Sequence, residues 1–241
     1  MAASPGASSL DPKLDPNMNS NTLRSILLGL FALVVGTSCK FNQQVAKGPY
    51  NTPAYRAANK RDVSVKVSLS NRMIYVKEGN RTLLTTPTAI GKPESPTPKG
   101  NFRTFNRLPR KRSNTYGFHL HPNGDIIPGK RVNTPRGARY VGYPMPFWVE
   151  FKSGYGFHSG SVWPMPRSHG CLRIHKNVAP TFFDLVGPGI PVHIADSQPE
   201  DAKEGKNVPR PTDYADPDPP AHVITSQSYF QTQPTQPSYI N

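Results

Sequence analysis

The sequence predicts a mainly β domain that contains one short helix. Residues 63–69 alternate apolar and polar side chains over seven positions, which is typical of a half-buried strand. Two further strand-like runs, 73–76 and 82–86, flank a turn centred on Gly79 and form a hairpin pattern. Apolar residues recur at helical spacing in only one stretch, after Asn177.

The rest of the predicted domain consists of shorter strands and long loops. Residues 102–105, 147–151 and 190–194 are rich in aromatic and β-branched side chains and are expected to be strands. Residues 93–100 and 108–130 contain so much proline, glycine and asparagine that we expect loops there.

The single helix is expected to begin after residue 177. Asn177 is a suitable N-cap, and Val178, Phe182 and Leu185 fall on one face. Residues 187–189, with the sequence Gly-Pro-Gly, end the helix. The final strand then follows within a few residues.

The N-terminal segment, residues 1–39, indicates export. One positive charge, Arg24, precedes about a dozen apolar residues, which is short for a membrane span. The segment ends on small residues before Cys39, a pattern that resembles the lipobox of bacterial lipoproteins, in which the cysteine is lipidated. An ordinary signal peptide with a chance cysteine and an uncleaved anchor are the alternatives. The acidic, proline-containing residues before Met18 suggest that translation begins at Met18.

The remaining chain divides into three parts. Residues 40–61 resemble a polar tether, and residues 62–195 have the size of a single folded domain. Residues 196–241 are rich in proline and glutamine and poor in aliphatic side chains, so we expect a disordered tail.

The chain is strongly basic, with 29 Lys and Arg against 15 Asp and Glu and a net charge of +14. This excess predicts attraction to polyanions. Nucleic acid is not expected as a partner because the export signal separates the protein from it, whereas a carboxylate-bearing wall polymer or an anionic membrane surface fits. A solvated basic face is the simpler alternative. Two clusters carry much of the charge: Arg103, Arg107, Arg110, Lys111 and Arg112, and Lys130, Arg131, Arg136 and Arg139.

Cys171 is the strongest candidate for chemistry. With Cys39 set aside, it is a lone thiol in an exported protein, where structural cysteines are usually paired. It lies in the string Ser-His-Gly-Cys-Leu-Arg, thirteen positions after His158. A histidine that accepts the thiol proton makes cysteine a nucleophile near neutral pH. His158 and His169 are both candidate bases.

These motifs resemble the L,D-transpeptidase catalytic domain of the YkuD type. The resemblance is carried by the opening hairpin with Ile-Gly-Lys at 90–92, by Ser-Pro-Thr-Pro-Lys-Gly at 95–100, and by the histidine and cysteine strings at 156–158 and 168–173. It implies a β-sandwich or barrel with one short helix after the motif. The His158-to-Ser168 spacing is shorter than the commonly quoted family pattern, and arginine follows Cys-Leu where some members have asparagine.

The resemblance also implies a reaction without a cofactor. Cys171 attacks the carbonyl of the third residue of a peptidoglycan stem peptide and expels the terminal D-Ala. The thioester passes to an amine of another stem in a 3–3 cross-link, to a wall-attached lipoprotein, or to water, which gives L,D-carboxypeptidase action. His158 is the implied base, its ring held by a backbone carbonyl such as that of Ser159. The implied location is the cell envelope, with a lipid anchor facing the periplasm.

Several neighbours of the cysteine are candidates for binding substrate. The amides of Gly170 and Cys171 are candidate oxyanion donors, because a glycine lets backbone approach substrate closely. Arg173 and Arg167 are candidates to hold a carboxylate. Ser159, Ser168 and His169 complete the predicted substrate-binding set, whereas His119, His121 and His175 are expected to be structural or surface groups.

Three alternatives to an L,D-transpeptidase fit parts of the sequence. A non-catalytic peptidoglycan-binding lipoprotein would use the basic charge alone. A papain-like protease is disfavoured by the β-rich pattern. A zinc site would use the donors His158, His169, Cys171 and His175, but no second cysteine or paired Cys-x-x-Cys accompanies them.

Overall fold

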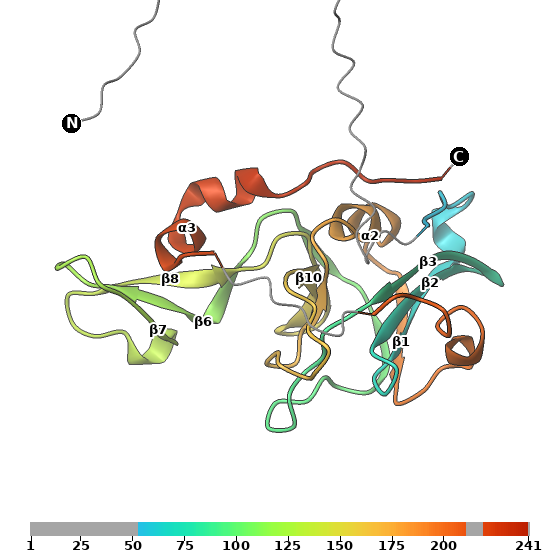
Figure 1. Cartoon of the computed structure of the whole chain (residues 1–241), viewed down its shortest axis with the longest axis horizontal. Coiled ribbons are helices and arrows are strands. Elements are labelled where there is room, and N and C mark those ends of the chain that lie inside the picture. Colours follow the sequence, from blue (N-terminus) through green and yellow to red (C-terminus); the bar gives the residue numbers. More distant parts are fainter. Residues whose placement is uncertain (1–52, 211–218, 241) are drawn as a thin grey trace, which may run out of the picture. The chain divides into compact units, whose positions relative to one another are not determined.

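The computed structural model describes residues 53–210 and 219–240. The predicted export segment, with Met18 and Cys39, and most of the predicted tether lie outside these residues. The described chain is mainly β, with three sheets and one helix of seven residues (Figure 1). No helix within the described ranges has both the length and the apolar character needed to cross a membrane.

The first sheet contains most of the predicted strands. Its central strand β1 pairs in parallel with β12, which begins at Pro191, and the other neighbouring strands are antiparallel. Alternation along β1 buries Val63, Val65 and Val67 in the core, as expected. The strand order is β3 (Arg81–Pro87), β2 (Met73–Glu78), β1 (Val63–Ser68), β12 (Pro191–Ala195) and β4 (Gly100–Arg103).

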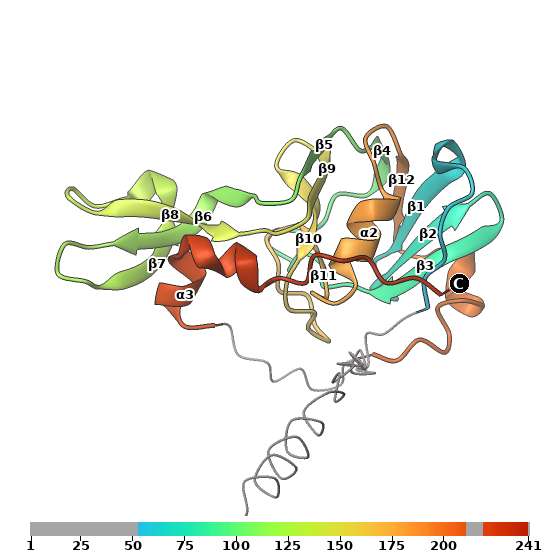
Figure 2. The ribbon, with the colours of Figure 1, turned by 90° about the horizontal axis from the view of Figure 1, so that it is seen from above.

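The second sheet carries the cysteine motif. Strands β10 and β11 run parallel, and β9 pairs antiparallel with both β10 and β5. The core lies between this sheet, the first sheet and α2 (Ala179–Leu185) (Figure 2). Within it, Phe157 contacts Phe182 with ring centroids 4.8 Å apart. The strand order is β11 (Leu172–Ile174), β10 (Tyr155–Ser159), β9 (Trp148–Lys152) and β5 (Asn106–Leu108). All three sheets have two free edges, so the described chain contains no closed barrel.

The third sheet occupies a region that we expected to be mostly loop. The prediction for 108–130 was wrong, because β6 (Arg112–Leu120) and β7 (Ile126–Lys130) pair there and β8 (Arg139–Pro144) joins them. These strands are largely exposed and lack an apolar alternation that would signal them. Glycines permit the close pairing: a Cβ on Gly142 would lie 2.0 Å from the Ser113 carbonyl oxygen. Figures 1 and 2 show this sheet extending from the core.

The predicted helix forms, but its start differs from the expectation. Helix α2 covers Ala179–Leu185, and Val178, not Asn177, occupies the N-cap without a side-chain hydrogen bond. The backbone N–H of Asn177 instead donates to Nδ1 of His175 over 3.3 Å. Phe182 and Leu185 are buried, so the shared apolar face is confirmed.

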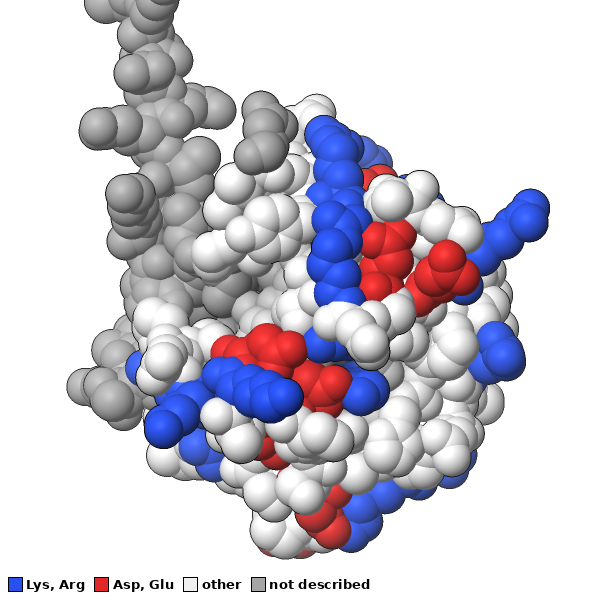
Figure 3. All heavy atoms as spheres, turned by 90° about the vertical axis from the view of Figure 1, so that its right-hand side faces the viewer, with Lys and Arg blue, Asp and Glu red and all other residues white. Residues whose placement is uncertain are grey.

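The segment after residue 195 was predicted to be disordered, but its described parts are ordered. They contain η3 (Pro199–Ala202), α3 (Ala221–Thr225) and η4 (Gln227–Thr232). Composition alone misses this because polar side chains find buried partners: Glu200 Oε1 lies 2.6 Å from Lys66 Nζ, and Glu204 Oε1 lies 2.9 Å from Lys77 Nζ. Figure 3 shows acidic and basic side chains side by side on the face of the molecule that it presents.

The C-terminal residues tie the third sheet to the rest of the domain. Arg112 of β6 donates to the carbonyl oxygens of Ile224 at 3.1 Å and Ser226 at 2.6 Å. From there the chain passes α2, and the backbone N–H of Ile240 donates to the Ala54 carbonyl over 2.7 Å (Figure 2). These contacts span two sheets, so the segment supports the placement of the third sheet.

Candidate active site

The parallel pair β10–β11 brings the two predicted catalytic residues together. His158 pairs with Arg173, and Cys171 directly precedes β11, two positions before Arg173. Because alternate residues share a face, His158, Cys171 and Arg173 lie on one face, while Phe157 and Leu172 point into the core. His158 and Cys171 are therefore diagonal neighbours on the same surface.

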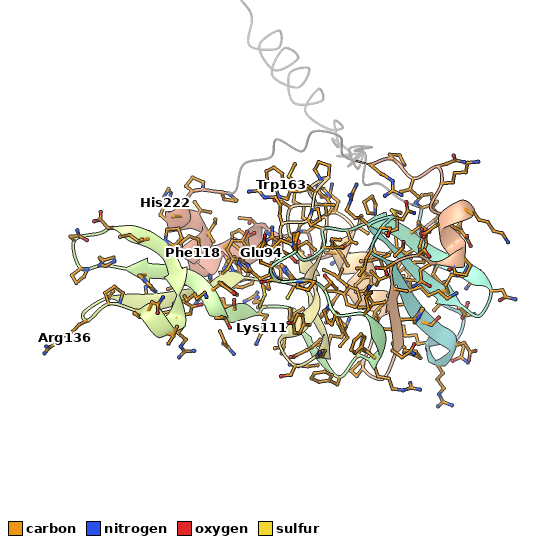
Figure 4. All side chains as sticks on the ribbon, turned by 90° about the horizontal axis from the view of Figure 1, so that it is seen from below. Glu94, Lys111, Phe118, Arg136, Trp163 and His222 are labelled. Atoms are coloured by element: carbon orange, nitrogen blue, oxygen red, sulfur yellow. The ribbon has the colours of Figure 1, made fainter. Side chains whose placement is uncertain are left out.

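That surface is the floor of a pocket of about 820 Å³. The opposite wall comes from the third sheet and the residues leading to it, including Lys111 and Phe118 (Figure 4). The floor includes Trp148, Glu150, Gly154, His158, Ser168, His169, Cys171 and Arg173. The wall includes Lys111, Tyr116, Phe118 and Lys130.

The His158 ring is held in one tautomer. The ring is buried, and Nδ1 lies 2.8 Å from the carbonyl oxygen of Ser159, as the resemblance led us to expect. A carbonyl can only accept, so Nδ1 carries the proton and Nε2 keeps its lone pair. Burial, reinforced by the charge of Arg173 and opposed by the Ser159 contact, lowers the pKa of His158 to about 3. The imidazole is therefore neutral at physiological pH and able to accept a proton.

The Cys171 thiol is also neutral at rest. Its Sγ donates to the carbonyl oxygen of Gly154 over 3.7 Å. Burial raises the pKa of the thiol; the Gly156 N–H and the Arg173 charge oppose this, and the Glu150 charge adds to it. An uncharged thiol beside an uncharged imidazole must transfer its proton as it reacts, so base and nucleophile act in one step.

Ser168 braces the turn that presents the cysteine. Its hydroxyl donates to the Cys171 carbonyl at 2.6 Å and accepts the Gly170 N–H at 3.0 Å. The Gly170 N–H, which we expected to be an oxyanion donor, is thus already used within the turn. Gly170 has φ of +107°, and a Cβ there would lie 2.5 Å from the Tyr155 ring, so glycine is required for the backbone path.

Thr97 is a supporting residue that the sequence analysis did not identify. Its buried hydroxyl donates to the Gly170 carbonyl at 3.0 Å and accepts the Gly91 N–H at 2.9 Å. The loop containing Thr97 therefore holds the cysteine turn through the Gly170 carbonyl, whereas Ser168 holds it through the Gly170 N–H and the Cys171 carbonyl. The only signal in the sequence was its place in the Ser-Pro-Thr-Pro string of the resemblance.

His169, the alternative base, lies where the floor meets the pocket wall. Its exposed ring stacks on Tyr116 of β6, with centroids 3.9 Å apart and planes 18° apart. Partial burial, followed by the charges of Lys92, Arg173 and Lys130, lowers the pKa of His169. The stack joins the motif to the third sheet and engages the ring in that contact.

The predicted substrate-binding arginines separate in the structure. Arg173 lines the pocket, and its Nε is buried without a hydrogen-bond partner among the described residues. Arg167 is exposed, lies over the Trp163 ring at 4.2 Å and is not part of the pocket lining. Ser159 is buried and donates from its hydroxyl to Gln233 at 3.4 Å, so its contribution is the carbonyl that holds His158.

Much of the first basic cluster serves the fold. Arg103 donates to the Gly189 carbonyl at 2.8 Å, and Arg107 donates to the Phe183 carbonyl at 3.0 Å while covering the Phe183 ring. These two guanidinium groups keep their charge but also stabilise the fold. Lys111 and Lys130 face the pocket instead.

His119 and His175 are engaged in structural contacts. The Nε2 atom of His119 lies 2.9 Å from the Lys130 carbonyl, and Nδ1 of His175 accepts a backbone N–H. Within the described ranges, no three His, Cys, Asp or Glu side chains are grouped so that they could hold a metal ion.

Comparison with known protein families identifies the family of this domain. Residues 62–194 match the YkuD model, the L,D-transpeptidase catalytic domain. The chain therefore belongs to the L,D-transpeptidase catalytic domain family, and the resemblance noted in the sequence is confirmed. The match includes both strands of the pocket floor and the whole of the third sheet.

Solved structures with a related chain path are also L,D-transpeptidases. One from Mycobacterium smegmatis is 21% identical with a TM-score of 0.43, and the alignment covers 56% of this chain and 58% of that one. One from Enterococcus faecium is 24% identical with a TM-score of 0.42, covering 56% of this chain and 50% of that one. The chain thus spans less than two thirds of these relatives. No curated protein sequence matches it.

Proposed function

We propose that this protein is a peptidoglycan L,D-transpeptidase that carries the acyl group as a thioester on Cys171. The observation that carries the proposal is the His158–Ser159 contact, which keeps the ring proton on Nδ1 and leaves Nε2 as a base on the face that Cys171 occupies. Family membership supplies the reaction class, and the pocket floor supplies residues suited to perform it.

In the first half-reaction, the thiol proton moves to Nε2 of His158 as Sγ attacks the carbonyl carbon of the third stem residue. The oxyanion accepts the Cys171 N–H, since the Gly170 N–H is held by Ser168. The carbon–nitrogen bond to the terminal D-Ala then breaks, and the His158 proton passes to the departing amine. The enzyme is left as a thioester with a neutral imidazole.

In the second half-reaction, an acceptor amine attacks the thioester and gives its proton to His158, which returns it to the sulfur. An amine from another stem gives a 3–3 cross-link, and a lysine of a wall-attached lipoprotein gives protein attachment. Water gives L,D-carboxypeptidase action. The half-reactions share one base, so the fate of the acyl group depends on which acceptor the pocket admits.

The charge around the pocket suits an acidic peptide. Arg173 offers a buried Nε without a partner among the described residues, and Lys111 and Lys130 lie on the wall. We assign Arg173 to the terminal carboxylate of the donor stem, because a guanidinium binds carboxylate through paired donors. With Cys39 as the lipidated residue, the enzyme would act in the cell envelope, anchored and facing the periplasm.

The test is incubation with a disaccharide tetrapeptide. The proposal expects release of D-Ala and formation of dimers, both lost in Cys171→Ala. Release of D-Ala without dimers would identify a carboxypeptidase. If Cys171→Ala retains the activity, the proposal is wrong. A purely binding lipoprotein would instead release no D-Ala. The wild type and Cys171→Ala would then pellet with wall material equally well, and high salt would abolish the binding.

A further inference from the structure

Glu150 of β9 gathers three hydrogen-bond donors beside the cysteine. Its Oε2 accepts the Trp148 indole N–H at 3.2 Å and the Asn106 amide at 3.0 Å. Its Oε1 accepts the backbone N–H of Gly154 at 3.0 Å. Burial opposes the charged carboxylate, but the donors at Gly154, Asn106 and Trp148 outweigh it and lower the pKa of Glu150. Glu150 is thus an anion in the floor of the pocket.

The contact between Glu150 and Gly154 is linked to the Cys171 thiol through Gly154 itself. Gly154 lies in the turn between β9 and β10, with φ of +78°. Its N–H is held by Glu150, and its carbonyl accepts the Cys171 thiol. Gly156, which pairs with Glu150 across the two strands, directs its own N–H to the thiol. The sulfur is therefore placed by a turn whose position Glu150 sets.

We propose that Glu150 is a positioning residue that fixes the Gly154 turn and thereby holds the Cys171 sulfur where it can attack substrate beside His158. The effect on turnover rests on the proposed function above, whereas the effect on the thiol itself does not. Glu150 lies outside the motif strings that carry the resemblance.

The charged and titratable groups around the thiol make the proposal testable. Arg173 comes from β11, His158 from β10 and Glu150 from β9, while His169 of the motif and Lys111 and Lys130 of the wall line the same pocket. Burial is the main cause of the raised pKa of the thiol, and Glu150 adds to it. Removing the charge and shortening the side chain should therefore have different consequences.

Two variants separate charge from reach. Glu150→Gln keeps an oxygen for Gly154 but removes the charge, so the midpoint of Cys171 alkylation by iodoacetamide should move to lower pH. Glu150→Asp keeps the charge but is one methylene shorter, so the midpoint should stay while kcat for D-Ala release falls on the order of ten-fold or more. KM should change less than about two-fold, because both carboxylate oxygens are already engaged by Asn106, Trp148 and Gly154. Glu94→Gln, an exposed loop acid, is the matched control and should behave as the wild type.

Alkylation is followed on the Cys171 peptide by mass spectrometry, so Cys39 does not interfere, and thermal unfolding confirms that each variant is folded. A wild-type midpoint in Glu150→Gln, or a wild-type kcat in Glu150→Asp, would overturn the proposal. If Glu150→Gln lowers kcat but leaves the alkylation midpoint of Cys171 unchanged, Glu150 supports β9 without acting on the thiol. If the wild type releases no D-Ala, the proposed function fails, but the alkylation midpoint still decides whether Glu150 acts on the thiol.

Discussion

The floor and the wall of the pocket are built in different ways. The floor, β10 and β11, has the core and α2 behind it, and its side chains are held by buried contacts such as His158 with Ser159. The wall, β6 to β8, is largely exposed and attaches through Arg112, the C-terminal segment and the Tyr116–His169 stack. Under the proposed function, the chemistry that needs fixed geometry would lie on the well-packed part, and substrate admission would fall to the part with fewer buried contacts.

Removing the base from the floor should have the largest effect. His158→Gln keeps a polar side chain of related size but lacks the imidazole lone pair that accepts the thiol proton. We expect kcat for D-Ala release to fall roughly 10²- to 10⁴-fold. His169→Gln, on the wall side, is the control and should affect turnover far less. The assignment of the base would be reversed if the His169 variant lost more activity than the His158 variant.

The same buried ring predicts how stability depends on pH. The folded-state pKa of His158, about 3, lies below the ordinary value of 6.5, so the unfolded chain binds this proton first. Stability from this group is complete above about pH 6.5 and is lost as pH falls toward 3, by at most about 1.4 kcal/mol per pH unit. Chemical denaturation of the wild type and His158→Gln between pH 6.5 and 5 measures this. Parallel curves for the two proteins would show that the ring is not buried in its neutral form.

Removing the Thr97 hydrogen bonds that support the cysteine turn should have a smaller effect. Thr97→Val removes the hydroxyl that joins Gly91 to Gly170 while keeping the shape of the side chain. Leaving those buried groups unpaired should cost about 1–3 kcal/mol in the free energy of unfolding and reduce kcat. Thr97→Ser, which keeps the hydroxyl, should retain most of both. Equal losses in the two variants would mean that packing of the methyl group, not the hydrogen bonds, is responsible.

Loosening the wall should have the smallest effect on the chemical step. Arg112→Ala removes donors to the carbonyls of Gly142, Ile224 and Ser226. We expect faster hydrogen exchange in the third sheet and the C-terminal segment, and a few-fold rise in KM with little change in kcat. Arg136→Ala, at the exposed end of the same sheet, is the control (Figure 4). A large fall in kcat with Arg112→Ala would show that the wall takes part in the chemistry.

The same contrast explains what could be predicted from the sequence. Burial of one face gives β1 a period-two pattern, so this strand was found. Strands β2 and β3 are buried along most of their length and were found as apolar and β-branched runs on either side of a turn. Strands β6 and β7 of the third sheet are largely exposed, so burial imposes no such pattern on them, and the proline, glycine and asparagine of this region favoured loops. The ordered C-terminal segment was missed for a related reason, because single contacts such as Lys66 with Glu200 leave no trace in composition.

For the site, local motifs were informative and distant supports were not. Cys171 and His158 stand in distinctive strings, and the contact to Ser159 is between neighbours in the chain. The hydroxyl of Thr97 and the carboxylate of Glu150 reach the cysteine turn only through folding, so spacing could not reveal them. The Gly170 N–H, expected as an oxyanion donor, donates to Ser168, two residues away, a local contact that the motif string did not reveal.

The central claim is that the sulfur of Cys171 carries the acyl group, and mass spectrometry of the enzyme during turnover tests it most directly. Wild-type protein mixed with the disaccharide tetrapeptide and quenched in acid should carry an adduct equal to the donor minus D-Ala, located on the Cys171 peptide. Under the same conditions Cys171→Ala should carry none and should release no D-Ala. Dimer formation by the alanine variant, or an adduct on another residue, would contradict the account.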